Sequence, residues 1–363
     1  MTDMLVAQRR EQLLNELQAS GGLKVIDLAA RLGVSRATVR RDLLDLENEG
    51  KLSRVRGGAM LATRHDSTVP EAQAAASATP LGLTLGLIVP SATYYYPRVV
   101  SGVQAVAAER GARVVITLSD YSGNSDAQRI EELAASGASG LLVALPGGHD
   151  LPEKNLHQLE ELGLPFVLLE RQPQDPFITC EFVASDHRQG AFAAVRHLAE
   201  LGHSKVALFT NGSPTASLLH QGHKAALQNL DLEPDVPVVD SGRPTLGSDE
   251  ATQCYDRFIR ACQEGQVRAA LVHSDHDAIE LMRRMRLQGL QAPRDLALIA
   301  YDDEIASLAD VPLTAVAPPK RTIGEYAARL LLDRLAAPEP NTVPVRQMLL
   351  QPRLNIRSSC GTA

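Results

Sequence analysis

Residues 293–316 read PRDLALIAYDDEIASLADVPLTAV. An apolar run ends in this stretch at Ala300, and the residues Tyr301-Asp302-Asp303 follow at once, which is typical of a buried strand that stops at a turn. Similar runs, mostly separated by segments of helical periodicity, end at Val89, Leu118, Leu145, Leu169, Val183, Phe209, Val239 and Val272. This alternation predicts parallel sheets covered by helices on both faces. Because roughly 280 residues are many for one sheet, we predict an α/β fold with two similar lobes.

The composition is that of a globular protein with aliphatic cores. Of the 363 residues, 44% are hydrophobic and only 4% are aromatic, so we expect more than one folding unit and no fibrous or disordered chain. No apolar run approaches the roughly 18 residues that span a bilayer. Arg9-Arg10-Glu11 interrupts the N-terminus before a secretory segment could form. We therefore expect a cytoplasmic protein with no membrane partner.

The sequence contains no pattern typical of a disulfide framework, a metal site or an active site. The four cysteines lie far apart without C-x-x-C spacing, so we expect reduced, packed thiols. His273, Asp275, His276 and Asp277 crowd one predicted strand end, but no separated partner completes a metal site. G-x-G-x-x-G, G-x-S-x-G and Walker A spacings do not occur. We expect no cofactor, no metal and no enzyme activity.

The net charge of -7 hides an asymmetry along the chain. Residues 1–65 contain 11 Lys and Arg against 8 Asp and Glu, whereas the remainder contains 25 against 35. The larger, acidic portion would repel a polyanion. A nucleic acid is therefore expected to bind at the N-terminus.

A change in composition marks a linker between the two portions. Residues 66–82 read DSTVPEAQAAASATPLG and contain almost no branched apolar residues. Residues 71–76 favour helix, so a short hinge helix is an alternative, although isolated helices of this length are marginal in water. We predict a DNA-binding domain at 1–65, a linker at 66–82 and a second domain at 83–358.

The N-terminal portion has the pattern of a helix-turn-helix. A short helix over 25–32 is followed by the turn Gly33-Val34, and Ser35 is a natural N-cap for a second helix over 36–48. Val39, Leu43 and Leu46 fall on one face of that helix, which predicts that they pack in a core. The arginines are left on the other faces.

Several polar residues of this portion suit contacts with DNA. Residues 51–58 alternate basic and apolar residues before a glycine pair, the pattern of a basic β-wing. Arginines suit guanine edges, and hydroxyls and wing arginines suit phosphates. Periodicity alone leaves an alternative open, in which this portion is a helical dimerisation or interaction module and its arginines are merely exposed to solvent. The candidate DNA-binding residues are Ser35, Arg36, Thr38, Arg40, Arg41, Arg54 and Arg56.

A resemblance adds to this interpretation. Residues 16–61 read ELQASGGLKVIDLAARLGVSRATVRRDLLDLENEGKLSRVRGGAML and resemble the N-terminal domain of the DeoR family of bacterial transcription regulators. The resemblance covers roughly residues 5–62. It implies that the helix beginning near Ser35 enters the major groove, with Arg54 and Arg56 on the wing.

Polar residues at the predicted strand ends form a candidate ligand site, since ligands of open parallel sheets bind beyond the carboxyl ends of the strands. Carboxylates, hydroxyls and aromatic rings together suit a small polyhydroxylated ligand. Taken singly, the carboxylates could equally be turn residues and the tyrosines packing residues. The strand-end residues include Tyr94, Tyr96, Asp186, Ser274, Asp275 and Asp302.

Three stretches, at residues 183–209, 270–282 and 293–316, resemble the effector-binding domain of the lac-repressor (LacI) family. They read VASDHRQGAFAAVRHLAELGHSKVALF, ALVHSDHDAIELM and PRDLALIAYDDEIASLADVPLTAV. The resemblance covers about residues 83–358. It implies two Rossmann-like lobes around a ligand cleft, with the chain crossing between them near 202–203, 318–319 and 344–348.

The resemblance also assigns roles to individual positions. Asp302 corresponds to the sugar-contacting aspartate of the family, and Ser274 stands in place of its asparagine. Where the family commonly has arginine, this chain has Leu219, with His220 beside it, and Pro318 replaces a common glutamine. These departures remove the usual partner of an anionic ligand and argue against a simple hexose. The candidate effector-binding residues are Tyr94, Tyr96, Asp186, His220, Ser274, Asp275 and Asp302.

Together these patterns predict a ligand-responsive transcription repressor that binds operator DNA and a small sugar or polyol effector. A homodimer is expected, because one winged helix offers few base contacts. The alternative is a solute-binding receptor of a transport system without a DNA role. The basic N-terminal domain and the lack of a secretory segment argue against that alternative.

Overall fold

The structure is a computed structural model, and it describes residues 22–24, 39, 52–55, 58–61, 82–119, 126–145, 148–339 and 342–361. The chain divides into two compact units, Met1–Ala76 and Ser77–Ala363. Of the helices that are described, none is long and apolar enough to cross a membrane.

The first unit contains a small antiparallel sheet. Its strands β1 (Gly22–Lys24), β2 (Leu52–Val55) and β3 (Gly58–Leu61) lie in the order β1-β3-β2. Val55 pairs with Gly58, so β2 and β3 form a hairpin where the sequence predicts a wing. Val39 lies in a helix and is fully buried, as its position on the helix predicts. Arg54 lies in β2, and the remaining predicted DNA contacts and residues 66–81 of the linker fall outside the described residues.

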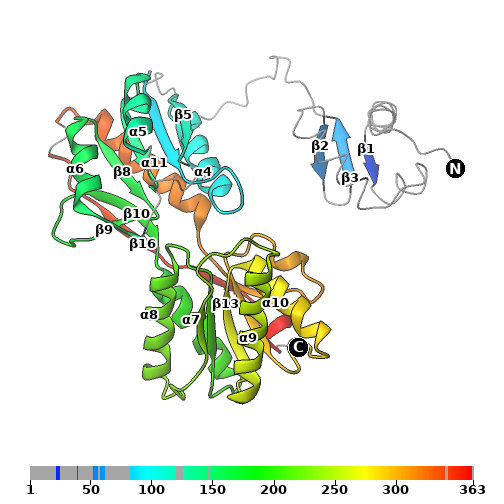
Figure 1. Ribbon diagram of the computed structural model, residues 1–363. Coiled ribbons are helices and arrows are strands. Elements are labelled where there is room, and N and C mark those ends of the chain that lie inside the picture. The colour runs from blue at the N-terminus through cyan, green and yellow to red at the C-terminus, as the bar shows by residue number, and fades with distance from the viewer. Residues whose placement is uncertain are drawn as a thin grey trace. The chain divides into compact units, whose positions relative to one another are not determined.

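The second unit has two lobes, each built on a six-stranded sheet (Figure 1). In the first lobe all strands are parallel, in the order β16-β10-β8-β6-β4-β5. Val103 of α4 and Ile323 of α11 pack on one face of this sheet, and Ile130 of α5 and Leu156 of α6 pack on the other. The elements are β4 (Thr84–Val89), α4 (Tyr96–Glu109), β5 (Arg113–Leu118), α5 (Asp126–Ala135), β6 (Gly140–Val143), α6 (Glu153–Glu161), β8 (Phe166–Leu169), β10 (Glu181–Ser185), α11 (Lys320–Ala336) and β16 (Gln347–Leu350), with the short pair β7 (Asp150–Leu151) and β9 (Gln172–Pro173).

The second lobe has the strand order β12-β11-β13-β14-β15-β17, with β17 antiparallel to β15 and the other pairs parallel. Val195 of α7 and Leu219 of α8 pack on one face, and Phe258 of α9 and Leu281 of α10 pack on the other. The elements are α7 (His187–Glu200), β11 (Ala207–Thr210), α8 (Ala216–Asn229), β12 (Val238–Asp240), α9 (Asp249–Glu264), β13 (Ala269–His273), α10 (Asp275–Leu287), β14 (Ala297–Tyr301), η1 (Ala306–Leu308), β15 (Thr314–Ala317), β17 (Arg353–Asn355) and η3 (Ser358–Cys360).

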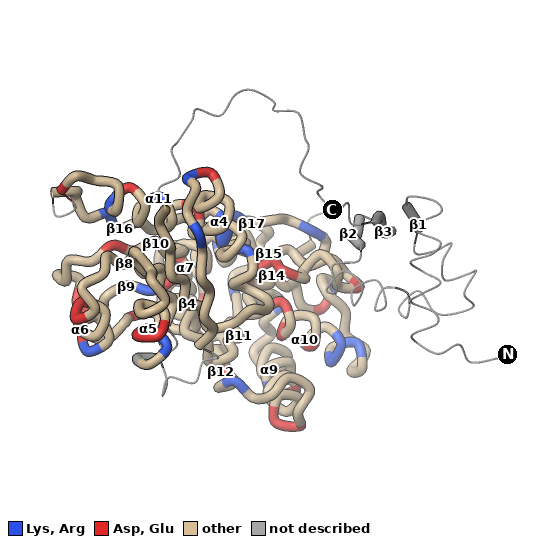
Figure 2. Tube along the Cα trace, turned by 90° about the horizontal axis from the view of Figure 1, so that it is seen from above, with Lys and Arg blue, Asp and Glu red and all other residues tan. Residues whose placement is uncertain are grey.

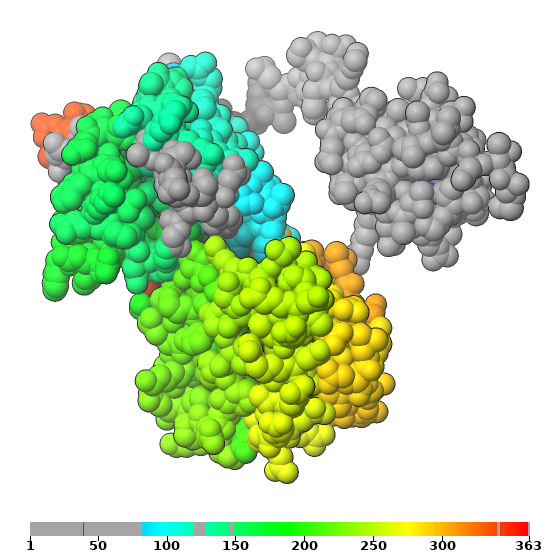
Figure 3. All heavy atoms as spheres, in the orientation of Figure 1, coloured from blue at the N-terminus to red at the C-terminus, as the bar shows by residue number. Residues whose placement is uncertain are grey.

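The chain passes between the lobes three times (Figure 1). The first passage, at Asp186, corrects the expected crossing near residues 202–203, because α7 follows β10 directly and already packs in the second lobe. Helical periodicity identifies an apolar face but not the sheet that this face covers. The second passage lies at 318–319, as expected. The third lies at 351–352, after the predicted 344–348, because β16 continues to Leu350. In the space-filling view the lobes meet along a shared border (Figure 3).

Two glycines let α4 and α11 pack backbone against backbone. A Cβ atom on Gly102 would lie 2.0 Å from the carbonyl oxygen of Arg321, and one on Gly324 would lie 2.0 Å from that of Val99. Only a hydrogen atom fits at either position. This crossing fixes α11, which follows the second passage, firmly to the first lobe.

Candidate functional site

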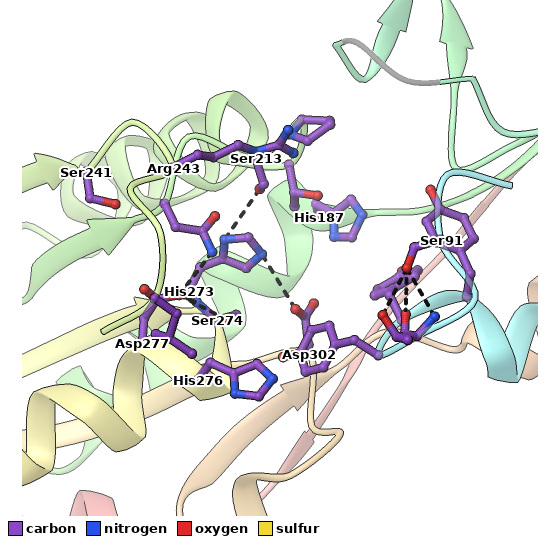
Figure 4. A pocket seen from close by; sticks show the side chains of 18 of the residues that line it. Ser91, His187, Ser213, Ser241, Arg243, His273, Ser274, His276, Asp277 and Asp302 are labelled. Carbon is purple, nitrogen blue, oxygen red and sulfur yellow. Dashed lines mark hydrogen bonds and ion pairs between the residues drawn. The ribbon is translucent and has the colours of Figure 1, made fainter. Parts of the chain in front are cut away.

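A cavity of about 530 Å³ lies between the two lobes, at the carboxyl ends of the parallel strands. From the first lobe it is lined by the loop after β4 and by Glu170-Arg171 after β8. From the second lobe it is lined by residues that follow β11, β12, β13 and β14 and by His187 at the start of α7. Side chains of these segments point toward a common space (Figure 4). The volume suits a small organic ligand.

Four of the predicted effector-binding residues line this cavity, namely Tyr94, Tyr96, Ser274 and Asp302. The Tyr94 ring lies 4.9 Å from the His276 ring, measured between centroids, and so presents an aromatic surface. Ser274 is the N-cap of α10, where its hydroxyl donates to Asp277 Oδ2 at 2.9 Å. The positive φ angles of Tyr94 (61°) and Asp302 (102°) are strained for residues with a side chain, and such strain gathers at functional sites.

The other three predicted residues do not line the cavity. Asp186 caps α7 and accepts a hydrogen bond from the Gln189 N–H at 3.0 Å. His220 lies 3.1 Å from Thr210 Oγ1 and lines a separate hollow. Asp275 is fully buried beneath the loop after β14. Asp186 and Asp275 were selected because they follow predicted strand ends, and His220 was selected from the resemblance to the LacI family. Hydrogen bonds within the protein use all three side chains.

The Asp275 carboxylate holds the loop that carries Asp302. It accepts hydrogen bonds from three successive backbone N–H groups, those of Asp303 at 3.1 Å, Glu304 at 2.6 Å and Ile305 at 2.9 Å. Burial raises the pKa of Asp275 to about 6, and the nearby Asp302 raises it too, while the three N–H groups oppose this. The Asp275 carboxylate therefore fixes the conformation of a loop that lines the cavity without lining the cavity itself.

Glu170 also lines the cavity, although it is not among the residues predicted from the sequence. Its carboxylate accepts hydrogen bonds from the Tyr95 hydroxyl at 2.5 Å and from the Ser185 N–H and hydroxyl, each at 2.9 Å. His187 Nε2 lies 3.6 Å from it. Burial alone would raise the pKa of Glu170, but His187 and the hydrogen bonds outweigh burial and lower it to about 2. Glu170 is therefore a charged carboxylate that the protein itself already satisfies.

A second carboxylate at the cavity, that of Asp277, also accepts its hydrogen bonds from groups of the protein. It accepts hydrogen bonds from the Tyr255 hydroxyl at 2.8 Å, from Asn211 Nδ2 at 3.0 Å and from the N–H and hydroxyl of Ser274. The Asn211 carbonyl oxygen is buried, and no described residue donates a hydrogen bond to it. Asn211 therefore offers the cavity an acceptor.

Asp302 differs from these two carboxylates in its contacts. Among the described residues its carboxylate contacts His273 Nε2 at 3.7 Å (Figure 4), which is beyond ordinary hydrogen-bond range. Burial lowers the pKa of His273, and Asp302 opposes this effect. His273 Nδ1 lies 3.5 Å from Ser213 Oγ. Asp302 thus keeps hydrogen-bonding capacity for a ligand.

The cavity can therefore bind a molecule that donates hydrogen bonds and presents an apolar face. Asp302 and Asn211 supply acceptors, and the Tyr94 ring supplies a flat apolar surface. The Arg171 guanidinium donates to the carbonyl oxygens of Leu145 and Glu170, each at 2.7 Å, and so is partly used by the backbone. Both positions could have been found from the sequence, because Glu170 directly follows the predicted strand end Leu169 and Asn211 lies two residues after Phe209.

Comparison with known proteins supports both domains. Residues 9–65 match the family of DeoR-like helix-turn-helix domains, and residues 195–360 match the periplasmic binding protein-like domain. The arabinose metabolism transcriptional repressor of Geobacillus stearothermophilus is 24% identical over 340 residues, which is 92% of this chain and 89% of the relative. The transcriptional regulator CelR of Thermobifida fusca is 28% identical over 347 residues, covering 92% and 96%.

Solved structures show the same fold. The complex of the regulator CelR with cellobiose superposes with a TM-score of 0.66 at 23% identity, covering 93% of this chain and 99% of that chain. The dimeric lac repressor superposes with a TM-score of 0.63 at 23% identity, covering 76% and 98%. These findings confirm both resemblances drawn from the sequence. The chain thus combines a DeoR-like helix-turn-helix domain with a periplasmic-binding-protein-like domain, and its homologues are transcriptional repressors of the LacI type.

Proposed function

We propose that this chain is a ligand-responsive transcription repressor that binds operator DNA through residues 1–65 and an uncharged sugar or polyol in the cavity between its lobes. The observation that carries the proposal is the pairing of a DNA-binding domain with a lined interlobe cavity in one chain. Relatives of similar length are named as repressors of arabinose metabolism and of the ribose operon. A linker at 66–82 would join the DNA-binding domain to an effector-binding domain at 83–358.

We assign the DNA-binding role to the first unit because of its charge. The described part of the second unit carries basic and acidic residues interspersed over both lobes (Figure 2), whereas residues 1–65 have an excess of Lys and Arg. Phosphate contacts supply much of the affinity for DNA. Ser35, Arg36, Thr38, Arg40 and Arg41 on the second helix, with Arg54 and Arg56 on the wing, are the proposed contacts. Such a role places the protein in the cytoplasm, and it requires no cofactor and no enzyme activity.

The uncharged character of the effector follows from the charges of the cavity. Glu170, Asp277 and Asp302 line it, so a carboxylate or phosphate would meet like charges. Arg171 and the exposed Arg243 are the lining arginines. The free acceptors on Asp302 and Asn211 suit hydroxyl groups. We place Tyr94, Tyr96, Ser274 and Asp302 in the effector site and transfer no effector role to Asp186, His220 or Asp275.

A thermal-shift screen tests the proposed effector class. Neutral sugars and polyols should raise the melting temperature, because a ligand present at 100 times its Kd stabilises the folded state by about 2.7 kcal/mol. Phosphate esters and acids of the same sugars serve as matched controls and should give no shift. If only the charged compounds stabilise the protein, the proposed class is wrong.

We also propose that two copies of the effector-binding domain form the functional dimer. The edge strand β5 of the first lobe exposes Val115 and Ile116, with 37% and 40% of their surface accessible. An exposed apolar edge strand favours pairing with another chain. A relative of known structure is described as a dimeric lac repressor. Dimerisation would present two winged helices to a pseudo-palindromic operator.

A further inference from the structure

The loop after β14 faces the cavity on one side and the first lobe on the other. Asp302 lines the cavity, and two residues later Glu304 reaches elements of the first lobe. The Asp275 carboxylate ties the backbone N–H groups of residues 303–305 together. Asp302 and Glu304 therefore belong to one short loop that is anchored to Asp275 at the start of α10.

Glu304 bridges two cations of the first lobe. Its Oε2 atom lies 2.9 Å from Arg98 Nε at the start of α4, and its Oε1 atom lies 2.7 Å from Lys320 Nζ at the start of α11. The Lys320 ammonium donates a hydrogen bond to the Asp302 carbonyl oxygen and lies 5.0 Å from the centre of the Tyr95 ring. The Lys320 side chain is 3% exposed and that of Glu304 is 11% exposed. The pair between them is thus largely screened from solvent.

We propose that Arg98, Glu304 and Lys320 form an interlobe latch that holds this edge of the cavity closed and sets the ratio of closed to open molecules. The two cations belong to the first lobe and the carboxylate to the second, so separation of the lobes must break both ion pairs. The Tyr94 ring and the His276 ring meet across the same border. The three latch residues act as positioning residues, and the proposal goes beyond the proposed effector and DNA roles.

Two other ion pairs of the described residues lie within a single lobe. Arg110 and Asp333 pair at 3.4 Å, but α4 and α11 both belong to the first lobe. Glu280 and Arg283 pair within α10 of the second lobe. Loss of either pair leaves the relation between the lobes unchanged. These pairs therefore provide matched controls for charge and exposure.

Spin-label distances measured on the full chain test the latch without effector or DNA. The four native cysteines are buried, so labels can be directed to Ala108→Cys at the end of α4 and Ser307→Cys in η1, both exposed positions. Dilution with unlabelled protein removes distances between two copies. The latch is expected to keep the distance distribution of the parent protein short and narrow.

Latch variants should add a longer distance to this distribution. Arg98→Ala should raise the open-to-closed ratio about 1.5- to 5-fold, the range for a partly exposed ion pair. Arg98→Glu should raise the ratio further, Arg98→Lys should largely restore it, and Glu304→Gln should exceed Arg98→Ala because it weakens both pairs. Arg110→Ala and Glu280→Gln should match the parent.

The variants of Arg98 give the decisive comparison. Arg98 is exposed on a helix surface, with 59% of its side chain accessible, so its variants should fold whatever the fate of Glu304→Gln. Identical distributions for the parent, Arg98→Ala and Arg98→Glu would show that these charges do not hold the lobes. A shift of equal size in Arg110→Ala would also overturn the latch, since that pair does not join the lobes.

Discussion

Asp302 has the greatest unused hydrogen-bonding capacity among the carboxylates of the cavity. Glu170 and Asp277 are each satisfied by several protein donors, whereas the described contact of Asp302 is 3.7 Å long. A ligand hydroxyl bound to a charged acceptor contributes about 1.5–3 kcal/mol. The Asp302→Asn variant should therefore bind the effector found in the thermal screen roughly 10- to 150-fold more weakly.

Two measurements, of operator affinity and of effector response, distinguish a role of Asp302 in effector binding from a role in the stability of the fold. The variant should keep its operator affinity without effector, and Asp235→Asn, at an exposed position of the same lobe, should behave as wild type. A response at the wild-type effector concentration would show that the pocket is placed wrongly. Loss of operator binding without effector would assign a structural role to this carboxylate.

His149 predicts how stability responds to acid. It is 3% exposed, and burial, with a further contribution from His187, lowers its pKa to about 3. Below the unfolded pKa of about 6.5 the unfolded chain gains a proton that the folded chain does not, so the free energy of unfolding falls as pH falls from about 6.5 to 3. The contribution approaches 1.4 kcal/mol per pH unit.

Urea unfolding between pH 7 and 4 measures this slope. The His149→Asn variant should show a shallower loss of stability than wild type, while His157→Asn, at an exposed position of α6, should leave the slope unchanged. Equal slopes in wild type and His149→Asn would mean that this buried imidazole does not contribute to acid lability.

At the scale of elements, the crossing of α4 and α11 has no room for a side chain. A methyl group on Gly102 would require displacement of the Arg321 carbonyl, which is backbone and cannot rotate away. Gly102→Ala should therefore destabilise the second unit by about 1–3 kcal/mol despite the better helix propensity of alanine. Thermal unfolding checks this, with Gln104→Ala on the exposed face of the same helix as the control.

The helix predicted over residues 36–48 leads to a prediction on DNA specificity. If Arg40 or Arg41 contacts a base edge, its replacement by alanine should cost about 1–3 kcal/mol at the operator and reduce discrimination between sequences. A role at phosphates alone would weaken all sequences alike and reduce the salt dependence. An operator sequence can first be selected from random DNA duplexes. Titrations of this operator and of unrelated DNA at several salt concentrations then distinguish a base contact from a phosphate contact. Unchanged affinity in the double alanine variant would contradict the helix assignment.

Many strand positions could be predicted from the sequence because the strands are continuous apolar runs. The runs ending at Val89, Leu118 and Leu169 stop where β4, β5 and β8 stop. The edge strand β16 was not predicted, because Gln347–Leu350 alternates exposed and half-buried residues. The position of the first crossing between the lobes was predicted wrongly, because the apolar pattern of a helix does not show which sheet the helix packs on. In the site, Tyr94 and Asp302 lie at the cavity. The position of Glu170 after a strand end is visible in the sequence, but its hydrogen bonds to Tyr95 and Ser185 join distant segments and could not be predicted.

The proposed dimer of the whole molecule forms through the exposed edge strand β5. Val115→Lys combined with Ile116→Glu should place charges on β5 and favour the monomer. Sedimentation of the full chain should give a dimer mass for the parent and a monomer mass for the variant, with weaker operator binding. A monomeric parent beginning near residue 80 would contradict dimerisation through the effector-binding domain.

Coupling between the effector and the operator would involve both units of the chain. An effector held by both lobes changes DNA binding only if its affinity differs between the open and closed states. Typical coupling of about 1–3 kcal/mol would change operator affinity roughly 5- to 150-fold. The effector's influence on the operator must equal the operator's influence on the effector.

The triple passage of the chain between the lobes also governs the order in which the protein can fold during synthesis. Lobe one lacks α11 and β16, and lobe two lacks β17 and η3, until the last part of the chain has been made. Chains generally fold domain by domain from the N-terminus as they emerge from the ribosome. Here the DNA-binding domain leaves the ribosome long before the last strand of either lobe has been synthesised. A nascent repressor is therefore able to meet DNA before it is able to sense its effector.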